Sequence, residues 1–262
     1  MRRVASLTFD FEECDLPRES GIDFSLDEGM AVSAEGAAEI LDVLERRGVK
    51  ATFFCTLNFA ERAPEIMRRI IAGGHEVAAH GVDHFRRSPD DPWACKEGIE
   101  RLYPGTKVTG YRQPRMFAVD CAALKAHGFA YDASLNPAFV PGRYMHLSTP
   151  RTRFIEDGLV RIPASVTPHV RFPLFWLSLH VLPLWLYLSL VRRTLRHDGF
   201  FTTYFHPWEF SATLAEKAQA LKVPMLVRRN LGKAMSSRLD FLVAALSSEG
   251  AEFRPLIAAA CA

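Results

Sequence analysis

The sequence has 262 residues, of which 48% are apolar and 24% are charged, and this composition excludes a disordered or collagen-like chain. The net charge is +2, so composition gives no general reason to expect nucleic-acid binding. The charge is unevenly distributed, because residues 1–150 carry 18 basic and 22 acidic side chains whereas residues 151–262 carry 14 and 8. The first part is therefore better suited to a cation site, and the second to an anionic partner.

The early part of the chain alternates between strand and helix patterns. Residues 4–11 predict a buried strand, and Ser33 is expected to cap a helix that ends at Gly48. A strand is expected over 49–56, and Asn58 with Glu61 resembles a capping box for a helix that continues to residues 73–74. A strand over 75–79 and a helix from about 90 to 102 follow.

The remaining strands are expected at 109–111, 129–131, 159–162, 201–205 and 252–256, with helices near 118–127 and 231–246. This amounts to about seven βα units, a pattern that favours a parallel sheet closing into a distorted (β/α) barrel. No linker or repeat interrupts the pattern, so we expect one α/β domain over residues 1–262. Residues 12–32 and 133–158 are expected to be long connections, which are often functional.

An uncharged apolar run extends over residues 172–191 and is followed by Arg192 and Arg193. Its length approaches that of a membrane span. Pro173, Pro183 and the central His180 count against a span, because a histidine is costly in hydrocarbon. A buried helix is favoured, and an interfacial helix and a true span remain as alternatives.

The five cysteines are scattered and form no CxxC motif. They are Cys14, Cys55, Cys95, Cys121 and Cys261. An odd, scattered set argues against a disulfide framework and indicates a reducing compartment. Because the N-terminus also lacks the pattern of a signal peptide, we expect a cytoplasmic protein.

Polar side chains follow several predicted strands, where reactive groups gather in parallel α/β folds. Asp10 and Glu12 are two residues apart and therefore point to the same side of a strand. His80 and His84 are four apart, so on one helical turn both could reach a metal ion, with a carboxylate as third ligand. Ordinary hydrogen bonding at a helix start is the alternative for this pair.

Asp10 and His206 both lie at strand ends and are candidates for a general base and a general acid. The alternatives are a capping or turn carboxylate for Asp10 and a turn residue fixed by Pro207 for His206. Arg112 is a candidate for orienting a carboxylate, and otherwise a surface arginine.

The motifs occur in the order TFDFEE, ATFF, GGHEVAAHGVDH, YRQP, YDASL and YFHPWEF. This series resembles the polysaccharide deacetylase family (carbohydrate esterase family four, the NodB-like domain) over about residues 4–257. The resemblance implies a distorted (β/α) barrel. It also implies a hydrolase that uses one divalent metal ion, with zinc expected and cobalt, nickel or manganese as alternatives, to remove an acyl group from the amide nitrogen of an amino sugar.

The resemblance assigns roles to individual residues. Asp10 matches the base, Arg112 the arginine that orients it, and His206 the general acid. His80 and His84 match two metal ligands. The family's usual metal-binding Asp is replaced by Phe11, so Glu12 is expected to complete the metal site.

Further roles follow from the same resemblance. The backbone N–H of Arg115 matches an oxyanion donor, and Asp132 matches a position that tunes the catalytic histidine. Tyr111, Pro114 and Trp208 are expected to bind substrate.

The expected substrate is an N-acetylated or N-formylated amino sugar in a polysaccharide, an oligosaccharide or a lipid-linked glycan. A lipid-linked substrate would bring the protein to the inner membrane surface, where Trp176, Trp185 and Tyr187 and the arginines at 192, 193 and 196 are candidate contacts. The alternatives are an allantoinase-like or cyclic-imide hydrolase on the same scaffold, and a carbohydrate-binding relative without catalysis.

Overall fold

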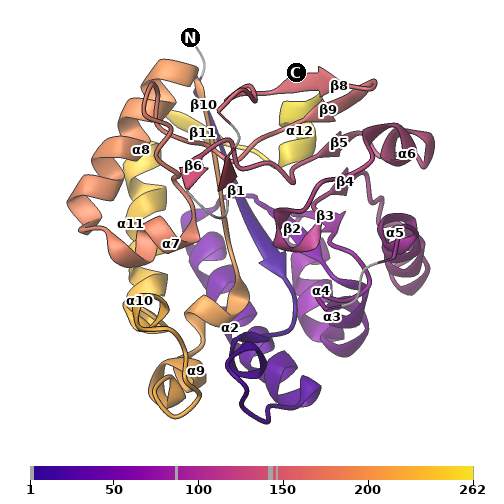
Figure 1. The fold of residues 1–262 in the computed structure, drawn as a ribbon, viewed down its shortest axis with the longest axis vertical. Coiled ribbons are helices and arrows are strands. Elements are labelled where there is room, and N and C mark those ends of the chain that lie inside the picture. The colour runs from indigo at the N-terminus through magenta and orange to yellow at the C-terminus, as the bar shows by residue number, and fades with distance from the viewer. Residues whose placement is uncertain (1–2, 86–87, 141–143, 146, 262) are drawn as a thin grey trace.

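The computed structural model describes residues 3–85, 88–140, 144–145 and 147–261, and a curled sheet lies at its centre (Figure 1). The strands are β1 (Arg3–Phe11), β2 (Thr52–Cys55), β3 (Glu76–Ala79), β4 (Gly110–Tyr111), β5 (Tyr131–Asp132), β6 (Phe139–Val140), β7 (Tyr144–Met145), β8 (Phe154–Glu156), β9 (Leu159–Arg161), β10 (Phe200–Phe205) and β11 (Ala251–Phe253).

Helices surround this sheet (Figure 1). They are α1 (Leu16–Glu19), α2 (Leu26–Arg47), α3 (Leu57–Arg62), α4 (Pro64–Ala72), α5 (Asp91–Leu102), α6 (Cys121–Ala126), α7 (Trp176–Val181), α8 (Leu184–Asp198), α9 (Ala212–Lys217), α10 (Met225–Arg228), α11 (Lys233–Ser248) and α12 (Leu256–Ala260). Two 3₁₀ helices, η1 (Pro114–Met116) and η2 (Pro207–Phe210), follow β4 and β10.

Seven strands run parallel in the order β10-β1-β2-β3-β4-β5-β9. β8 adds to β9 in the antiparallel sense, and β11 pairs with the first residues of β1. Beyond β9 the chain returns to β10, where the backbone N–H of Ser165 donates to the carbonyl of Thr202 at 3.0 Å. The predicted fold class, an α/β chain with a distorted barrel of about seven strands, is confirmed.

Aromatic side chains on β1 and β2 fill the space between the sheet and its helices. Phe9 stacks on Phe53 with ring centroids 5.2 Å apart, and Phe11 meets the same ring edge-on at 4.8 Å. Fully burying one such side chain contributes about 1.5–3 kcal/mol. These contacts fix β1 against its neighbours and so fix the direction of the polar side chains at its end.

The first long helix begins earlier than the sequence pattern predicted. Ser25 caps α2 through a reciprocal capping box with Glu28, whereas Ser33 is buried within the helix. Part of the region 12–32 is thus helical. Similarly, Thr56 rather than Asn58 caps α3, because its hydroxyl accepts from the N–H of Phe59 at 3.1 Å.

Helix α2 also lies directly against η2, next to the end of β10. A Cβ at Gly36 would lie 1.8 Å from the carbonyl oxygen of Pro207, so only glycine permits this approach. The contact positions the segment that immediately follows His206.

The apolar run at 172–191 forms two helices, α7 and α8, separated near Pro183. Trp176, Leu179 and Tyr187 in this run pack against the main core, which agrees with the buried alternative. Within the described residues, no helix combines the length and the apolar character needed to cross a membrane.

Candidate active site

A cavity of about 350 Å³ opens at the carboxyl ends of β1 and β10. Its titratable lining includes Asp10, Glu12, Asp15, His80, His84 and His206. These residues come from sequence positions nearly 200 apart and meet because β10 and β3 flank the β1–β2 pair. Five of the six were predicted from the sequence.

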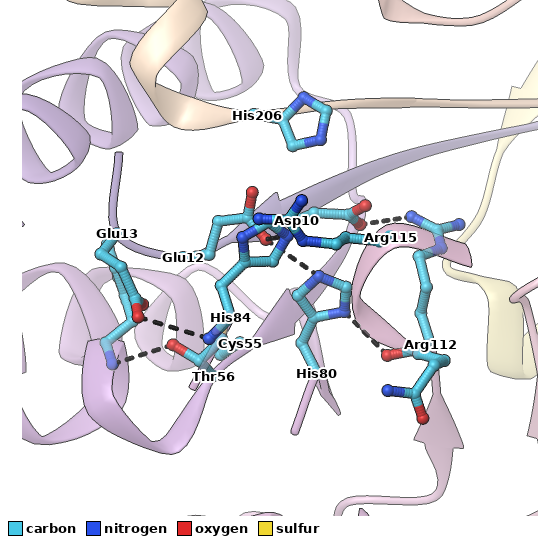
Figure 2. A network of polar contacts seen from close by, with 12 residues as sticks. Asp10, Glu12, Glu13, Cys55, Thr56, His80, His84, Arg112, Arg115 and His206 are labelled. Carbon is cyan, nitrogen blue, oxygen red and sulfur yellow. Dashed lines mark hydrogen bonds and ion pairs between the residues drawn. The ribbon is translucent and has the colours of Figure 1, made fainter. Parts of the chain in front are cut away.

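Strand alternation at the end of β1 orients two carboxylates into this cavity. Asp10 and Glu12 line it, while Phe11 is fully buried in the core between Phe53 and Phe59. Phe11 thus points away from the site, and Glu12 lies where a third ligand was expected (Figure 2).

The two histidines converge on Glu12. Nε2 of His80 lies 3.1 Å and Nε2 of His84 3.3 Å from Oε2 of Glu12. They do not share a helical turn as predicted, because residues 80–84 form an irregular segment in which Gly81 has φ of +82°. This turn brings the two rings together, 6.4 Å apart between centroids.

The opposite nitrogen of each imidazole is fixed by an acceptor. Nδ1 of His80 donates to the carbonyl oxygen of Arg112 at 2.7 Å, and Nδ1 of His84 faces Oδ2 of Asp15 at 2.6 Å. Such hydrogen bonds select the tautomer that leaves Nε2 free to bind a metal. No role was assigned to Asp15 from the sequence, and its supporting contact to His84 was not anticipated.

The types of donor that meet here are those that divalent cations use. Two Nε2 atoms and one carboxylate oxygen face one another, and two-histidine, one-carboxylate sets are ordinary sites for divalent metals. Burial lowers the pKa of His84, but Glu12 and Asp15 outweigh it and raise that pKa to about 9, so the surroundings favour positive charge. Among the described residues, however, no group of three or more His, Cys, Asp or Glu side chains is arranged so that it could hold a metal ion as it stands.

Arg112 holds Asp10 in place and keeps it charged. Its guanidinium pairs with Oδ1 of Asp10, donates to the hydroxyl of Thr8 at 2.9 Å and lies 4.1 Å over the ring of Phe54. Burial would raise the pKa of Asp10, but Arg112 and the nearby histidines lower it below its ordinary value. Asp10 is therefore an ionised carboxylate that can accept a proton.

Arg115 lies on the cavity wall in a strained turn. Its φ is +60° and that of Met116 is +56°, a region that non-glycine residues rarely adopt and that concentrates at functional sites. The Arg115 side chain pairs with Asp15 at 3.0 Å and with Glu19. The oxyanion role of its backbone N–H stays a prediction.

His206 is held by Glu209 rather than by Asp132. The backbone N–H and Nδ1 of His206 both face Oε1 of Glu209, the latter at 3.0 Å. The carboxylate of Asp132 instead bonds Arg161 at 2.9 Å and the hydroxyl and N–H of Ser134. The prediction that Asp132 tunes His206 is therefore corrected. Asp132 is fully buried and pairs with Arg161, and the carboxylate that contacts His206 is that of Glu209.

Of the three residues expected to bind substrate, only Trp208 lines the cavity. Its indole stacks on the ring of His206, with centroids 5.0 Å apart and 14° between planes. Tyr111 is fully buried against Phe129. Pro114 is also buried, and its ring lies against the backbone of Gly81. The aromatic lining residues that the sequence analysis did not assign to the site are Phe175, Trp176 and Tyr204.

The curled parallel sheet defines a (β/α)-barrel protein. The histidines and carboxylates at the carboxyl ends of its strands are side chains of the kinds that hydrolases use for catalysis. Residues 2–125 match the family model described as polysaccharide deacetylase. The resemblance to the polysaccharide deacetylase family, predicted from the motifs, is confirmed.

Individual relatives cover the chain only partly. A chitooligosaccharide deacetylase of Sinorhizobium fredii is 41% identical over 63 residues, which are 24% of this chain and 27% of that protein. A peptidoglycan deacetylase of Helicobacter pylori is 26% identical over 161 residues, covering 52% of this chain and 55% of that one. The chain thus spans about a quarter to a half of the length of these relatives.

The solved structures agree over a longer range. The structure of a peptidoglycan N-acetylglucosamine deacetylase is similar with a TM-score of 0.53 and 17% identity, covering 97% of this chain and 86% of that one. At this identity the likeness shows the fold alone.

Proposed function

We propose that this chain is a metal-dependent hydrolase that removes an acetyl or formyl group from the amide nitrogen of an amino sugar. The observation that carries the proposal is the convergence of the two Nε2 atoms, of His80 and His84, on Glu12, beside ionised Asp10 and across from His206 (Figure 2). The family match and the deacetylase relatives support the reaction class.

His80, His84 and Glu12 would hold one divalent ion, zinc being the expected one with cobalt, nickel or manganese as alternatives. When bound, that ion supplies a Lewis acid that polarises the acyl carbonyl. Asp15 and the Arg112 carbonyl would orient the two imidazoles without binding the ion themselves.

The proton transfers belong to this chain's own residues. Asp10 accepts a proton from the attacking water, and the Arg115 N–H donates to the oxyanion. Because Nδ1 of His206 is engaged by Glu209, Nε2 is the atom that delivers a proton to the leaving nitrogen. Water and amide are thereby converted into a free amine and a short carboxylate.

The cavity wall supports a sugar as the substrate. Trp176 and Trp208 lie edge-to-face with ring centroids 5.5 Å apart, and Tyr204 lines the same cavity. Rings of this kind present an apolar face and a polar tip, which suits a sugar with its C–H face and hydroxyl groups.

A direct assay tests the proposal. The purified chain, loaded with zinc, is incubated with chitooligosaccharides and with N-formylated amino sugars, and released amine and carboxylate are measured. We expect release that is lost with a chelator and restored by metal. Release of neither product from any N-acyl sugar by a metal-loaded protein would refute the proposed function.

The same assay separates the alternatives left by the sequence. Ring opening of a ureide or cyclic imide, without amine release from sugars, would favour an allantoinase-like reaction. Sugar binding with no turnover by a metal-loaded protein would favour a non-catalytic relative.

We also propose a cytoplasmic location, with the substrate displayed at the inner membrane surface if it is a lipid-linked glycan. Five cysteines without a disulfide support a reducing compartment. Fractionation of cells into cytosol, membrane and extracellular material, followed by immunodetection, tests it.

A further inference from the structure

His180 is a buried histidine that the proposed reaction does not use. It lies on α7, has no exposed surface, and follows Trp176 by one helical turn. Its Nδ1 faces the carbonyl oxygen of Arg229, and its Nε2 lies 2.9 Å from Oε2 of Glu209. Burying a polar ring of this kind is unfavourable unless both nitrogens find partners, and here each nitrogen has one.

Both ring nitrogens of His180 therefore face acceptors. The carbonyl oxygen of Arg229 can only accept, so Nδ1 carries a hydrogen. The carboxylate of Glu209 lies at Nε2, so the buried ring is held between two acceptors.

Glu209 is thereby held from two sides. One oxygen accepts from the backbone N–H and Nδ1 of His206, and the other accepts from His180. Burial would raise the pKa of Glu209, but the hydrogen bonds from His180 and His206 lower it below its ordinary value. The carboxylate can thus stay charged where a solitary buried acid would take up a proton.

We propose that His180 is a positioning residue: through Glu209 it keeps the Nδ1 hydrogen of His206 directed at the carboxylate and fixes the orientation of the ring, so that Nε2 faces the cavity and can carry the proton that is delivered. This rests on the proposed function, in which Nε2 of His206 is the proton donor. Trp176 supports the arrangement, because its indole meets the rings of both His180 and His206 edge-on, at 5.9 and 5.3 Å.

Without His180, the second oxygen of Glu209 would be buried without its donor. Glu209 would then take up a proton or turn away, and Nδ1–H of His206 would lose its acceptor. The charged and titratable groups around these rings are Asp10, Glu12 and Asp15 on the cavity side, and Tyr187 and Arg238 on the core side. Within the described residues, none of these groups donates a hydrogen bond to Glu209 that could replace the one from His180.

The first experiment is independent of activity. Nitrogen-15 NMR of the His206 ring reports the tautomer of the neutral imidazole in the wild type, in His180→Gln and in Ser178→Ala. Ser178 is the matched control, because it is buried on the same helix and its hydroxyl bonds the carbonyl of Pro173, not Glu209. We expect Nδ1–H in the wild type and the control, and a mixture of tautomers in His180→Gln.

The second experiment is a double-mutant cycle on turnover with metal-loaded protein. His180→Gln is expected to lower kcat by roughly 10–100-fold with little change in KM and with full metal content, the range found when a supporting hydrogen bond is lost. In the Glu209→Gln background, His180→Gln should cause almost no further loss of kcat, because His180 acts only through Glu209.

The two experiments fail in different ways. An unchanged His206 tautomer in His180→Gln, or an equal loss of kcat in both backgrounds, overturns the role of His180. A wild type that binds metal and shows the expected tautomers but releases no amine refutes the proposed function, while the tautomer result still decides the positioning of His206.

Discussion

At the scale of single residues, the site separates groups that would hold a metal from groups that would move a proton. His80 faces Glu12 through Nε2, and His206 lies across from both residues (Figure 2). Nδ1 of His206 faces Glu209 instead. Substitution of His80 and substitution of His206 should therefore impair different properties, metal binding in the first case and turnover in the second.

His80→Ala is expected to lose metal and activity together. His206→Ala is expected to keep its metal and lower turnover by roughly 10²–10⁴-fold, the usual contribution of a positioned acid. Metal content by elemental analysis and kcat on an N-acyl sugar are the measurements. His127→Ala, at an exposed histidine stacked on Trp93, is the control and should change neither. Full metal retention by His80→Ala would reverse the assignment.

Glu12 and Asp15 should also be separable, because they contact different nitrogens of His84. Glu12 lies 3.3 Å from Nε2, whereas Asp15 lies 2.6 Å from Nδ1. Glu12→Gln removes a charged ligand, and we expect metal binding to be lost. Asp15→Asn keeps an acceptor for Nδ1, and we expect metal affinity to fall by about 10–100-fold.

Competition with a chelator measures both affinities. If Asp15→Asn lost metal as completely as Glu12→Gln, Asp15 would be a ligand and not a support.

For single residues, the sequence could predict only what local patterns such as strand alternation determine. Strand alternation placed Asp10 and Glu12 together with Phe11 opposite, and strand ends located His80, Arg112 and His206. Glu209 and His180 could not be paired in this way, because they are 29 positions apart and meet only when α7 packs beside β10. The i+3 spacing of Glu209 from His206 was the one available signal.

At the scale of elements, α10 adds an exposed apolar edge beside the cavity. Pro224 and Val227 line the cavity, whereas Met225 and Leu226 between them are 74% and 50% exposed. Arg228 and Arg229 follow and are exposed as well. Tyr187 is fully buried and is not available for the predicted membrane contact, whereas Trp176 lines the cavity and is partly buried.

Contact with an anionic membrane stays a prediction, and substitutions in α10 and at Arg193 test it most directly. Arg192 and Arg196 already share Glu249, whereas Arg193 is exposed. We expect sedimentation with phosphatidylglycerol vesicles that weakens at high salt, because each basic residue near an anionic surface contributes about 1 kcal/mol.

Met225→Ser with Leu226→Ser, and separately Arg192→Gln with Arg193→Gln, should reduce the bound fraction. Ile155→Ser is the matched control, because Ile155 is 68% exposed on β8 and does not line the cavity. A wild type that stays in the supernatant at low salt contradicts the prediction.

Element boundaries were less predictable than element order. The sequence pattern predicted the βα alternation because buried strands and amphipathic helices carry distinct periods. It misplaced the start of α2, since Ser33 and Ser25 are both chemically suited to cap and only packing decides between them. It also could not separate a buried from an interfacial helix at 172–191, because both require the same apolar composition.

At the scale of the whole molecule, we expect stability at low pH to depend on His75, which does not line the cavity. His75 precedes β3, meets the ring of Phe53 edge-on at 5.2 Å, and accepts at Nδ1 from the N–H of Ala51 at 3.2 Å. Burial, with a smaller contribution from Lys50, lowers its pKa to about 4. The folded chain thus keeps this imidazole neutral where the unfolded chain protonates it.

The sign of the pH dependence follows from proton counts. Between about pH 6.5 and 4 the unfolded chain binds more protons at His75 than the folded chain, so the free energy of unfolding should fall as the pH falls through that window. His84 and His206 have raised pKa values and contribute with the opposite sign, because their stabilisation is lost as the pH rises. The contribution of His75 must therefore be measured as a difference between the wild type and a variant.

His75→Gln keeps a side-chain oxygen that can accept from Ala51 but cannot be protonated in this range. We expect it to lower stability at pH 7 through lost packing on Phe53, and to show a smaller further loss between pH 6.5 and 4 than the wild type does. Urea unfolding of metal-free protein at several pH values provides the free energies. His127→Gln, at an exposed histidine, should retain the wild-type dependence. Parallel curves for the wild type and His75→Gln would show that His75 is not the group that titrates on unfolding.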